Sequence, residues 1–97
     1  MAKKPLEIST RRFESRDEAR KFFQEILYRY KIGERVSEAD AADLAGLIQR
    51  HPEYAEKVGR GIDHFAIQSA DHGTRCFRVV RTDGTWARFS FKTCLQG

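Results

Sequence analysis

Basic side chains and a tryptophan recur through the last quarter of the sequence, and these residue types suit contact with RNA. Between residues 74 and 94 there is one acid, Asp83, against five cations: Arg75, Arg78, Arg81, Arg88 and Lys92. Guanidinium groups contact phosphates or stack on bases, and the indole of Trp86 can stack on an unpaired base. The alternative is a solvated sheet surface on which arginine stems shelter Trp86.

Two cysteines and two of the histidines offer the residue types of a zinc site or of a thiol nucleophile: Cys76, Cys94, His64 and His72. Structural zinc sites pair their ligands at short spacings, and no CxxC occurs here, so we expect no metal and no other cofactor. A catalytic cysteine also needs a lowered pKa and an oxyanion hole, and no motif marks one. We therefore expect small, semi-buried cysteines that act as apolar residues.

Carboxylates are the remaining candidates for chemistry. Asp40 and Asp43 fall on one face of an expected helix, near its start, where acids interact favourably with the helix dipole. Asp63, Asp71 and Asp83 fall at strand ends and turns, which is where aspartate favours tight turns. The sequence therefore predicts no hydrolytic pair, and we expect a protein that is not an enzyme.

The basic residues need a scaffold, and an Asp-Gly pair at 83–84 between two alternating runs predicts a β-hairpin. A two-residue loop would place Phe89 opposite Arg78 and mix charge into both faces. A three-residue loop, with its glycine in the left-handed region, instead places Phe77 opposite Phe89 and Arg78 opposite Arg88. We expect the longer loop, because the hydrophobic pattern selects the register.

This register gives the hairpin one apolar and one basic face. The apolar face would carry Phe77, Val79, Ala87, Phe89 and Phe91, and the other Cys76, Arg78, Val80, Trp86, Arg88 and Ser90. A preceding strand over 62–69 alternates with Phe65 and Ile67 inward, or with the reverse set inward. In the first case His64 joins the basic face, while Arg75, Arg81 and Lys92 lie near the strand ends.

Three helices are expected before this sheet. Ser15 with Glu18 forms a capping box ahead of an apolar stripe, and Ser37 begins a second helix. Pro52 suits the first turn of a third, which Gly59 ends. The sequence predicts an α+β fold, with three helices packed on one face of a small, mainly antiparallel sheet that ends in a β-hairpin; a strand from Leu6 to Phe13 would join a sheet edge.

Length and composition place these elements in one domain. The chain has 97 residues and a formal net charge of +4, which hints at polyanionic partners. We expect a flexible tail at 1–5 and a single α+β domain at 6–97. No apolar run is long enough to span a bilayer and no signal peptide is visible, so we expect a cytoplasmic protein without a membrane partner.

An ordered set of short motifs resembles the plant "defective chloroplasts and leaves" (DCL) family and its small bacterial relatives. The motifs run from about Phe13 to Cys94: 13–19, Phe22-Phe23, 26–30, 50–52, 57–62, 74–77, 81–84 and 89–91. The resemblance implies a role around RNA. The plant member is linked to maturation of chloroplast ribosomal RNA, and a related domain ends the largest subunits of plant-specific RNA polymerases. It draws attention to 74–77, Arg81, Asp83-Gly84 and Cys94, and brings no catalytic residue with it.

The hypothesis from the sequence is a non-enzymatic RNA-binding or ribosomal-RNA-processing accessory domain, with an RNA partner such as a ribosomal RNA precursor. Its contacts would come from Arg75, Arg78, Arg81, Trp86, Arg88, Lys92 and His64. The alternative is a protein-interaction module that docks on a larger RNA-processing or transcription complex. It would use either Trp86 or the acidic helices over 37–61, where five acids accompany three bases.

Overall fold

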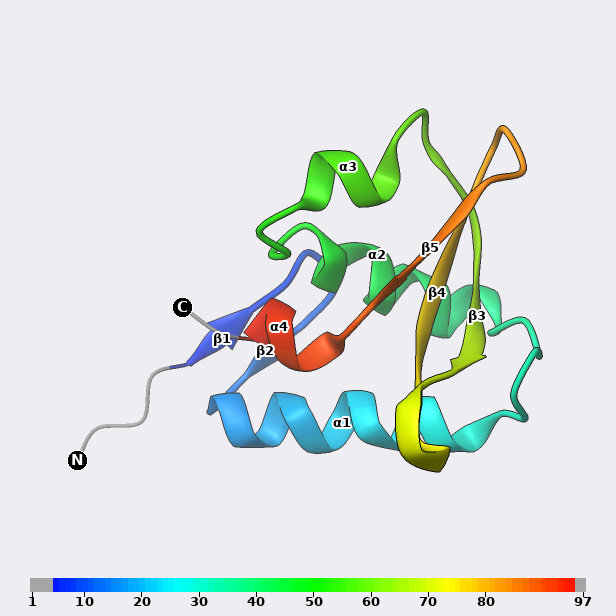
Figure 1. Ribbon diagram of the computed structural model, residues 1–97. Coiled ribbons are helices and arrows are strands. Elements are labelled where there is room, and N and C mark those ends of the chain that lie inside the picture. The colour runs from blue at the N-terminus through cyan, green and yellow to red at the C-terminus, as the bar shows by residue number, and fades with distance from the viewer. Residues whose placement is uncertain (1–4, 96–97) are drawn as a thin grey trace.

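The computed structural model describes residues 5–95, so the predicted tail, apart from Pro5, lies outside the described residues. Within them four helices and two small antiparallel sheets form the fold (Figure 1). The elements follow in chain order as β1 (Leu6–Glu7), β2 (Arg12–Phe13), α1 (Arg16–Arg29), α2 (Glu38–Ile48), α3 (Tyr54–Val58), β3 (Ile62–Ser69), the 3-10 turn η1 (Asp71–Gly73), β4 (Arg75–Arg81), β5 (Trp86–Phe89) and α4 (Phe91–Leu95).

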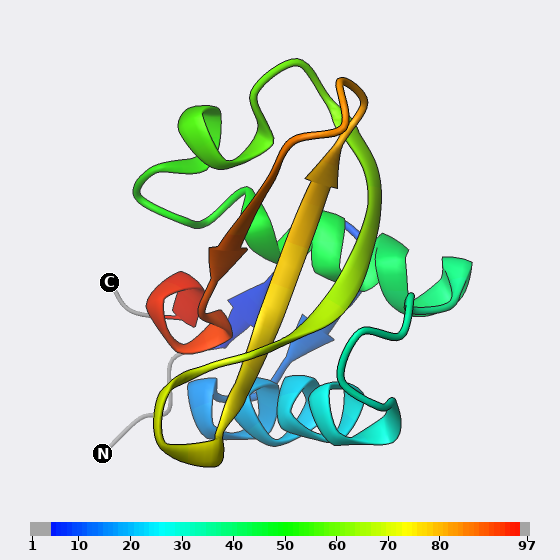
Figure 2. The same cartoon turned by 45° about the vertical axis from the view of Figure 1, so that its right-hand side comes forward.

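The larger sheet has the order β3-β4-β5 and is antiparallel throughout (Figure 2). In the hairpin Phe77 pairs with Phe89 and Arg78 with Arg88, which confirms the predicted register. The Arg81 N–H donates to the Thr85 carbonyl at 2.7 Å and closes a three-residue loop whose glycine has φ +88°. The longer loop is therefore confirmed.

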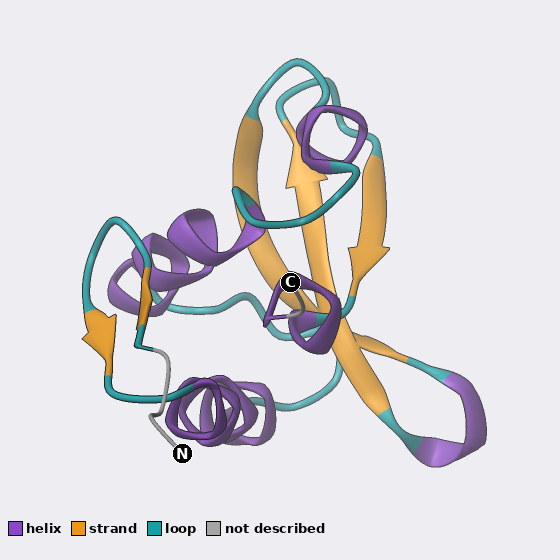
Figure 3. Cartoon of the chain, turned by 90° about the vertical axis from the view of Figure 1, so that its left-hand side faces the viewer, coloured by secondary structure: helices purple, strands orange, loops and turns teal. Residues whose placement is uncertain are grey.

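The two faces of this sheet differ as the alternation predicts. The inner face is buried and carries Phe65, Ile67, Phe77, Val79 and Phe89, which form one core with residues of α1, α2 and α4. The helices lie on this side of the sheet, and no described helix covers the opposite side (Figures 1 and 3). That opposite side, called here the outer face, carries His64, Ala66, Gln68, Cys76, Arg78, Val80, Trp86 and Arg88.

The predicted starts of the first two helices are confirmed at the atomic level. Ser15 Oγ accepts a hydrogen bond from the Glu18 N–H at 3.2 Å, and Ser37 Oγ accepts one from the Asp40 N–H at 3.2 Å. The buried side of α1 carries Ala19, Phe23, Ile26 and Leu27, at the spacing of one helical face. The third helix does not have Pro52 in its first turn as predicted: α3 begins at Tyr54, after a turn that contains Pro52. It ends, as expected, at Gly59, whose φ is +58°.

The prediction of a first strand at the edge of the main sheet is wrong. Residues 6–13 instead fold back as the separate β1–β2 hairpin, closed by a hydrogen bond of 2.9 Å from the Ile8 N–H to the Arg11 carbonyl. Its apolar residues are buried, and it approaches α2 at Gly46, where a Cβ would lie 2.7 Å from Ser9 Oγ. Leu6 and Phe13 face each other across the hairpin, and the turn at residues 8–11 lies between them, so this segment suits a short hairpin better than one long strand.

The edge of β3 is occupied by another segment, residues 33–36. The Gly33 N–H donates to the Ile67 carbonyl at 2.7 Å, and the Val36 N–H donates to the Phe65 carbonyl at 3.0 Å. The Ile67 N–H returns a hydrogen bond of 3.1 Å to the Glu34 carbonyl. This segment therefore pairs with the edge of β3 between Phe65 and Ile67.

The count of three helices is also too low, because the last strand ends at Phe89 and α4 follows. Phe91, expected on the apolar strand face, begins this helix, and Lys92, expected near a strand end, lies in its first turn. Phe91, Cys94 and Leu95 are buried at a spacing of three and four residues, which is helical. Ser90 Oγ accepts from the Lys92 N–H at 3.3 Å, so a serine again marks the start of a helix.

Candidate nucleic-acid interface

Arg78, Trp86 and Arg88 lie together in the middle of the outer face. Arg78 and Arg88 are directly opposite on β4 and β5, and Val80 pairs with Trp86 beside them. The Arg78 guanidinium carbon lies 5.3 Å from the centre of the indole, a cation–π distance, and Trp86 is 48% exposed. The hairpin register thus builds a basic and aromatic surface.

The Arg78 side chain is held at one end and unsatisfied in the middle. Its Nη1 donates to Gln68 Oε1 at 3.2 Å, from the neighbouring strand. Its Nε is buried and has no hydrogen-bond acceptor among the described residues. Because this atom is covered, only the terminal Nη groups of Arg78 can donate to an anion that approaches the outer face.

His64 joins the same face, because Phe65 and Ile67 point inward on β3. It lies opposite Val80, and its Nδ1 is 2.6 Å from an oxygen of Asp63. This hydrogen bond lowers the pKa of the Asp63 carboxyl. The outer face therefore unites four of the predicted residues: His64, Arg78, Trp86 and Arg88.

Arg75 and Arg81 are directed instead to the C-terminal ends of helices. Arg75 Nη1 donates to the Tyr30 carbonyl, just after α1, at 2.7 Å, and its guanidinium lies 4.8 Å from the Tyr28 ring centre. Arg81 donates to the Lys57 and Glu56 carbonyls of α3 at 3.0 and 3.1 Å. Because helix ends leave carbonyls without intrahelical partners, both arginines serve the fold.

Arg50 makes a similar contact with the last helix, through Nε to the Cys94 carbonyl at 3.2 Å. Lys92 is exposed on α4 and lines two hollows beside α1. The structure therefore places the predicted cations on the outer face, at the ends of helices and on α4. The nucleic-acid role of Arg75, Arg81 and Lys92 stays a prediction.

Neither cysteine has the setting of a nucleophile. Burial raises the pKa of the Cys76 thiol, against an opposite effect of nearby Arg88, and burial raises the pKa of Cys94 to about 12. Both thiols are therefore protonated at neutral pH. Across residues 5–95, no three side chains of His, Cys, Asp or Glu come together as a metal site would require.

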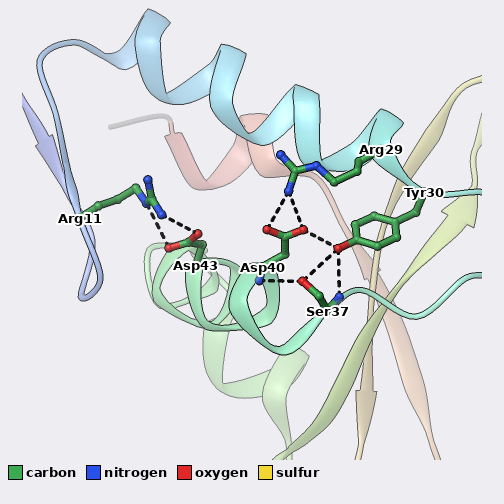
Figure 4. A network of polar contacts seen from close by, with 6 residues as sticks. All are labelled: Arg11, Arg29, Tyr30, Ser37, Asp40 and Asp43. Carbon is green, nitrogen blue, oxygen red and sulfur yellow. Dashed lines mark hydrogen bonds and ion pairs between the residues drawn. The ribbon is translucent and has the colours of Figure 1, made fainter.

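The acids Asp40 and Asp43 hold a polar network that sequence reasoning missed (Figure 4). Arg29 Nη1 lies 3.0 and 2.8 Å from the two Asp40 oxygens, and the Tyr30 hydroxyl donates to the same carboxylate. This carboxylate raises the pKa of Arg29. Arg11 forms a bidentate pair with Asp43, at 3.1 and 3.0 Å.

These contacts join α2 to α1 on one side and to the β1–β2 hairpin on the other. Both carboxylates are buried although they belong to the first two turns of a helix. Their partners lie between 10 and 33 residues away in sequence, so no local pattern reveals them. The only signal was the shared helix face of Asp40 and Asp43.

Comparison with known proteins places this architecture in a family. The family model described as "Protein of unknown function (DUF3223)" matches residues 24–95. The chain belongs to the DUF3223 family. The resemblance to the DCL proteins is confirmed by 33% identity over 72 residues to the chloroplastic protein DCL of Solanum lycopersicum. The matched range begins inside α1, so it omits the β1–β2 hairpin.

One further relative of this DUF3223 domain is informative, as is the share of each relative that is matched. DNA-directed RNA polymerase IV subunit 1 of Arabidopsis thaliana is 38% identical over 73 residues, which are 74% of this chain and 5% of the subunit. The match to the tomato protein covers 71% of this chain and 32% of that protein. The chain thus spans about a third or less of these curated relatives.

A solved structure shares the whole fold. The solution NMR structure of an uncharacterized protein from Rhodospirillum rubrum has a TM-score of 0.88 and 43% identity, and the match covers 97% of this chain and 91% of that one. Within residues 5–95 of the DUF3223 domain, no helix has the length and apolar character needed to cross a membrane. The cytoplasmic location stays a prediction.

Proposed function

We propose that this protein is a non-enzymatic RNA-binding domain that contacts RNA with the outer face of its sheet. The observation that carries the proposal is the cluster of Arg78, Arg88 and the exposed Trp86 on a face that no described helix covers. The arginines would contact phosphates and the indole would stack on an unpaired base. His64 would border the same contact.

Electrostatics supports an anionic ligand at this position. Like charges directly opposite on neighbouring strands repel each other, and the Arg78–Arg88 pair has this arrangement. A phosphate between them would relieve the repulsion and accept charge-assisted hydrogen bonds from both guanidinium groups.

The name of one relative supports a role around RNA. One is named as a subunit of an RNA polymerase, and the DCL proteins are named as chloroplastic. For this chain we propose an accessory part in RNA processing, with structured precursors such as those of ribosomal RNA as the partner class. Arg75 and Arg81 are left out of the proposed contacts because their guanidinium groups bind helix carbonyls.

The decisive experiment is a salt-titrated binding curve with fluorescent single-stranded RNA of about 12 nucleotides, within the roughly 4–16 that single-strand binding folds cover. The double variant Arg78→Ala/Arg88→Ala should bind about tenfold or more weakly. The slope of log K against log salt should fall by about 1.4, because each lost phosphate contact removes about 0.7.

A matched control removes the same charge elsewhere. Arg12 in β2 and Lys31 after α1 are exposed and lie off the outer face, so Arg12→Ala/Lys31→Ala should keep the parent slope to within about 0.7, one contact. If both double variants weaken binding equally, the effect is net charge alone. Parent-like binding by the outer-face variant would show that the proposed site is wrong.

Trp86 separates stacking from charge. Base–aromatic stacking contributes about 1–3 kcal/mol per base by alanine substitution, so Trp86→Ala should lower affinity about fivefold to 150-fold with an unchanged salt slope. Trp86→Phe keeps a ring and should retain most of the affinity. Equal losses in both variants would contradict stacking.

A second candidate is a protein-interaction module, favoured by the similarity to part of a polymerase subunit. The acidic helices are a weaker docking surface than the sequence suggested, because Asp40 and Asp43 are buried in ion pairs. Trp86 would then be the anchor. This candidate predicts that Trp86→Ala abolishes association with a purified partner complex after nuclease treatment, while RNA affinity of the parent is negligible.

A further inference from the structure

A groove follows the exposed side of α1 and consists of three adjoining hollows, of about 420, 340 and 610 Å³. Shared lining residues connect them. Lys92 belongs to the first and second, Arg20 to the first and third, and Gln24 and Tyr28 to the second and third. We call these hollows together the α1 groove. Each volume is within the range of about 300–1,000 Å³ seen for ligand sites.

The α1 groove opens onto the outer face of the sheet. Cys76 and Ser90 line its second hollow, the one of about 340 Å³. Cys76 lies two residues before Arg78 on the same face of β4, since side chains alternate along a strand. Ser90 follows β5 two residues after Arg88. The proposed RNA-binding face and the groove are therefore neighbours across this edge.

Charge in the groove suits a polyanion. Five cationic residues and two acidic ones line the three hollows: Arg16, Arg20, Lys21, Arg75 and Lys92, with Asp17 and Glu25. With every charge counted, five cations against two acids leave an excess of three positive charges, and this count includes Arg20 and Lys21, which pair with Asp17 at 2.5 and 3.6 Å. The excess of positive charge extends along the groove.

Tyr28 provides an aromatic surface inside it. This side chain is 57% exposed, lines two of the hollows and has the Arg75 guanidinium 4.8 Å from its ring centre. A ring braced by a guanidinium is a platform on which a base can stack. From Arg16 to Tyr28 the helix rises about 18 Å, at about 1.5 Å per residue, which is room for several nucleotides.

We propose that one strand of RNA continues from the outer face, past Cys76 and Ser90, into the α1 groove. Lys92 and Arg20 lie at the junctions between hollows and contact the phosphates, and Tyr28 stacks on a base. The RNA is single-stranded here, because the bases of a duplex are stacked on each other and closed to both Trp86 and Tyr28. This inference rests on the proposed function of the outer face.

The length of the RNA tests the path. The double variant Arg20→Ala/Lys92→Ala should bind a 12-nucleotide RNA about tenfold more weakly, since two phosphate contacts are lost. An RNA of about 4 nucleotides reaches only the outer face and should bind this variant as it binds the parent. Tyr28→Ala should show the same dependence on length, and Tyr28→Phe should behave like the parent.

Each other result has a definite meaning. Parent-like binding of the long RNA by the groove variants, with weak binding by Arg78→Ala/Arg88→Ala, overturns the groove and leaves the outer face in place. Parent-like binding by both sets overturns both proposals. Equal losses for short and long RNA also overturn the path, because the short RNA cannot span it. The urea midpoint of each variant checks that it is folded.

An acidic peptide is the competing occupant. A glutamate peptide of the same net charge as the 12-nucleotide RNA serves as the probe. It should bind weakly, because it has no rings to stack on Tyr28. Binding as tight as that of the RNA, with the same losses in the Arg20, Lys92 and Tyr28 variants, would overturn the assignment of the groove to RNA.

Discussion

Asp40 accepts hydrogen bonds from two residues at the end of α1 while also lying in the first turn of α2. Its carboxylate is 10% exposed, so its partners replace much of its water. Hydrogen bonds to charged groups contribute about 1.5–3 kcal/mol, and the half-exposed Arg29 weakens this figure through solvent screening.

Asp40→Asn should therefore lower the free energy of unfolding by about 1–2 kcal/mol, which a urea titration followed by circular dichroism measures. Asp17→Asn is the control, since Asp17 pairs with Arg20 on an exposed surface. Its urea midpoint should match that of the parent. Equal shifts in the two variants would show that burial of Asp40 has no special effect.

His51 gives the stability a pH dependence. It is buried between α2 and α3, and its Nδ1 accepts the Glu53 N–H at 3.0 Å. Burial lowers the pKa of His51, positive Lys57 lowers it further, and Glu53 opposes them. The unfolded chain then binds the proton more readily, so this contribution is complete above pH 6.5, the ordinary value, and is lost as the pH falls from there through the lower pKa of the folded protein.

Urea titrations at pH 7.5 and 5.5 should show a larger loss of stability for the parent than for His51→Asn, whose amide oxygen accepts the same hydrogen bond without titrating. His64 and His72 are present in both proteins and cancel. The lowered pKa values of Asp17, Asp63 and Asp83 place their titration below this window. Identical losses would rule out His51 as the titrating group.

At the scale of elements, arginines supply the C-terminal caps of three helices: Arg75 for α1, Arg81 for α3 and Arg50 for α4. A cap of this kind stabilises twice, through hydrogen bonds to unpaired carbonyls and through its charge near the negative end of the helix dipole. Arg88, in β5, is exposed, and we propose that it contacts RNA instead.

Arg81→Ala and Arg88→Ala should therefore have opposite effects. Arg81→Ala removes hydrogen bonds to Lys57 and Glu56 and should cost about 1–2 kcal/mol of stability, with RNA affinity unchanged. Arg88→Ala should weaken RNA binding and change stability by less than about 0.5 kcal/mol. Urea titrations and RNA-binding curves of both variants test these two roles. Weaker RNA binding by Arg81→Ala would show that Arg81 also contacts RNA.

Elements that show a clear hydrophobic pattern or a capping residue could be predicted from the sequence. The hairpin register follows from Phe77 and Phe89, and the helix starts follow from Ser15 and Ser37. The short helix α4 was missed because Phe91 continues the alternation of Ala87 and Phe89 in the preceding strand, although the apolar spacing of the helix was visible. The caps made by arginines could not be seen, because a contact between Arg75 and Tyr30 spans 45 residues.

At the scale of the molecule, the core extends beyond the range of the family match. Leu6, Ile8, Phe13, Ala19 and Phe23 are buried in the same core as the sheet, yet they precede residue 24. The β1–β2 hairpin is further tied to α2 by the Arg11–Asp43 pair and by its close approach at Gly46.

A protein truncated to residues 24–95 should therefore be unfolded, because it loses five buried apolar side chains and half of α1. The four larger side chains, Leu6, Ile8, Phe13 and Phe23, each contribute on the order of 2 kcal/mol, and a domain has only about 5–15 kcal/mol in total. A protein of residues 5–95 is the control and should give a dispersed amide spectrum. Cooperative unfolding of the shorter protein would contradict this view of the core.

The pairing of residues 33–36 with β3 has a further consequence for how the protein meets other molecules. An open strand edge is a template for aggregation and for partners that add a strand of their own. Here the Phe65 and Ile67 carbonyls already accept hydrogen bonds from Val36 and Gly33. A partner that adds a strand to β3 between Phe65 and Ile67 would have to displace residues 33–36, so a partner at this part of the edge must recognise side chains instead.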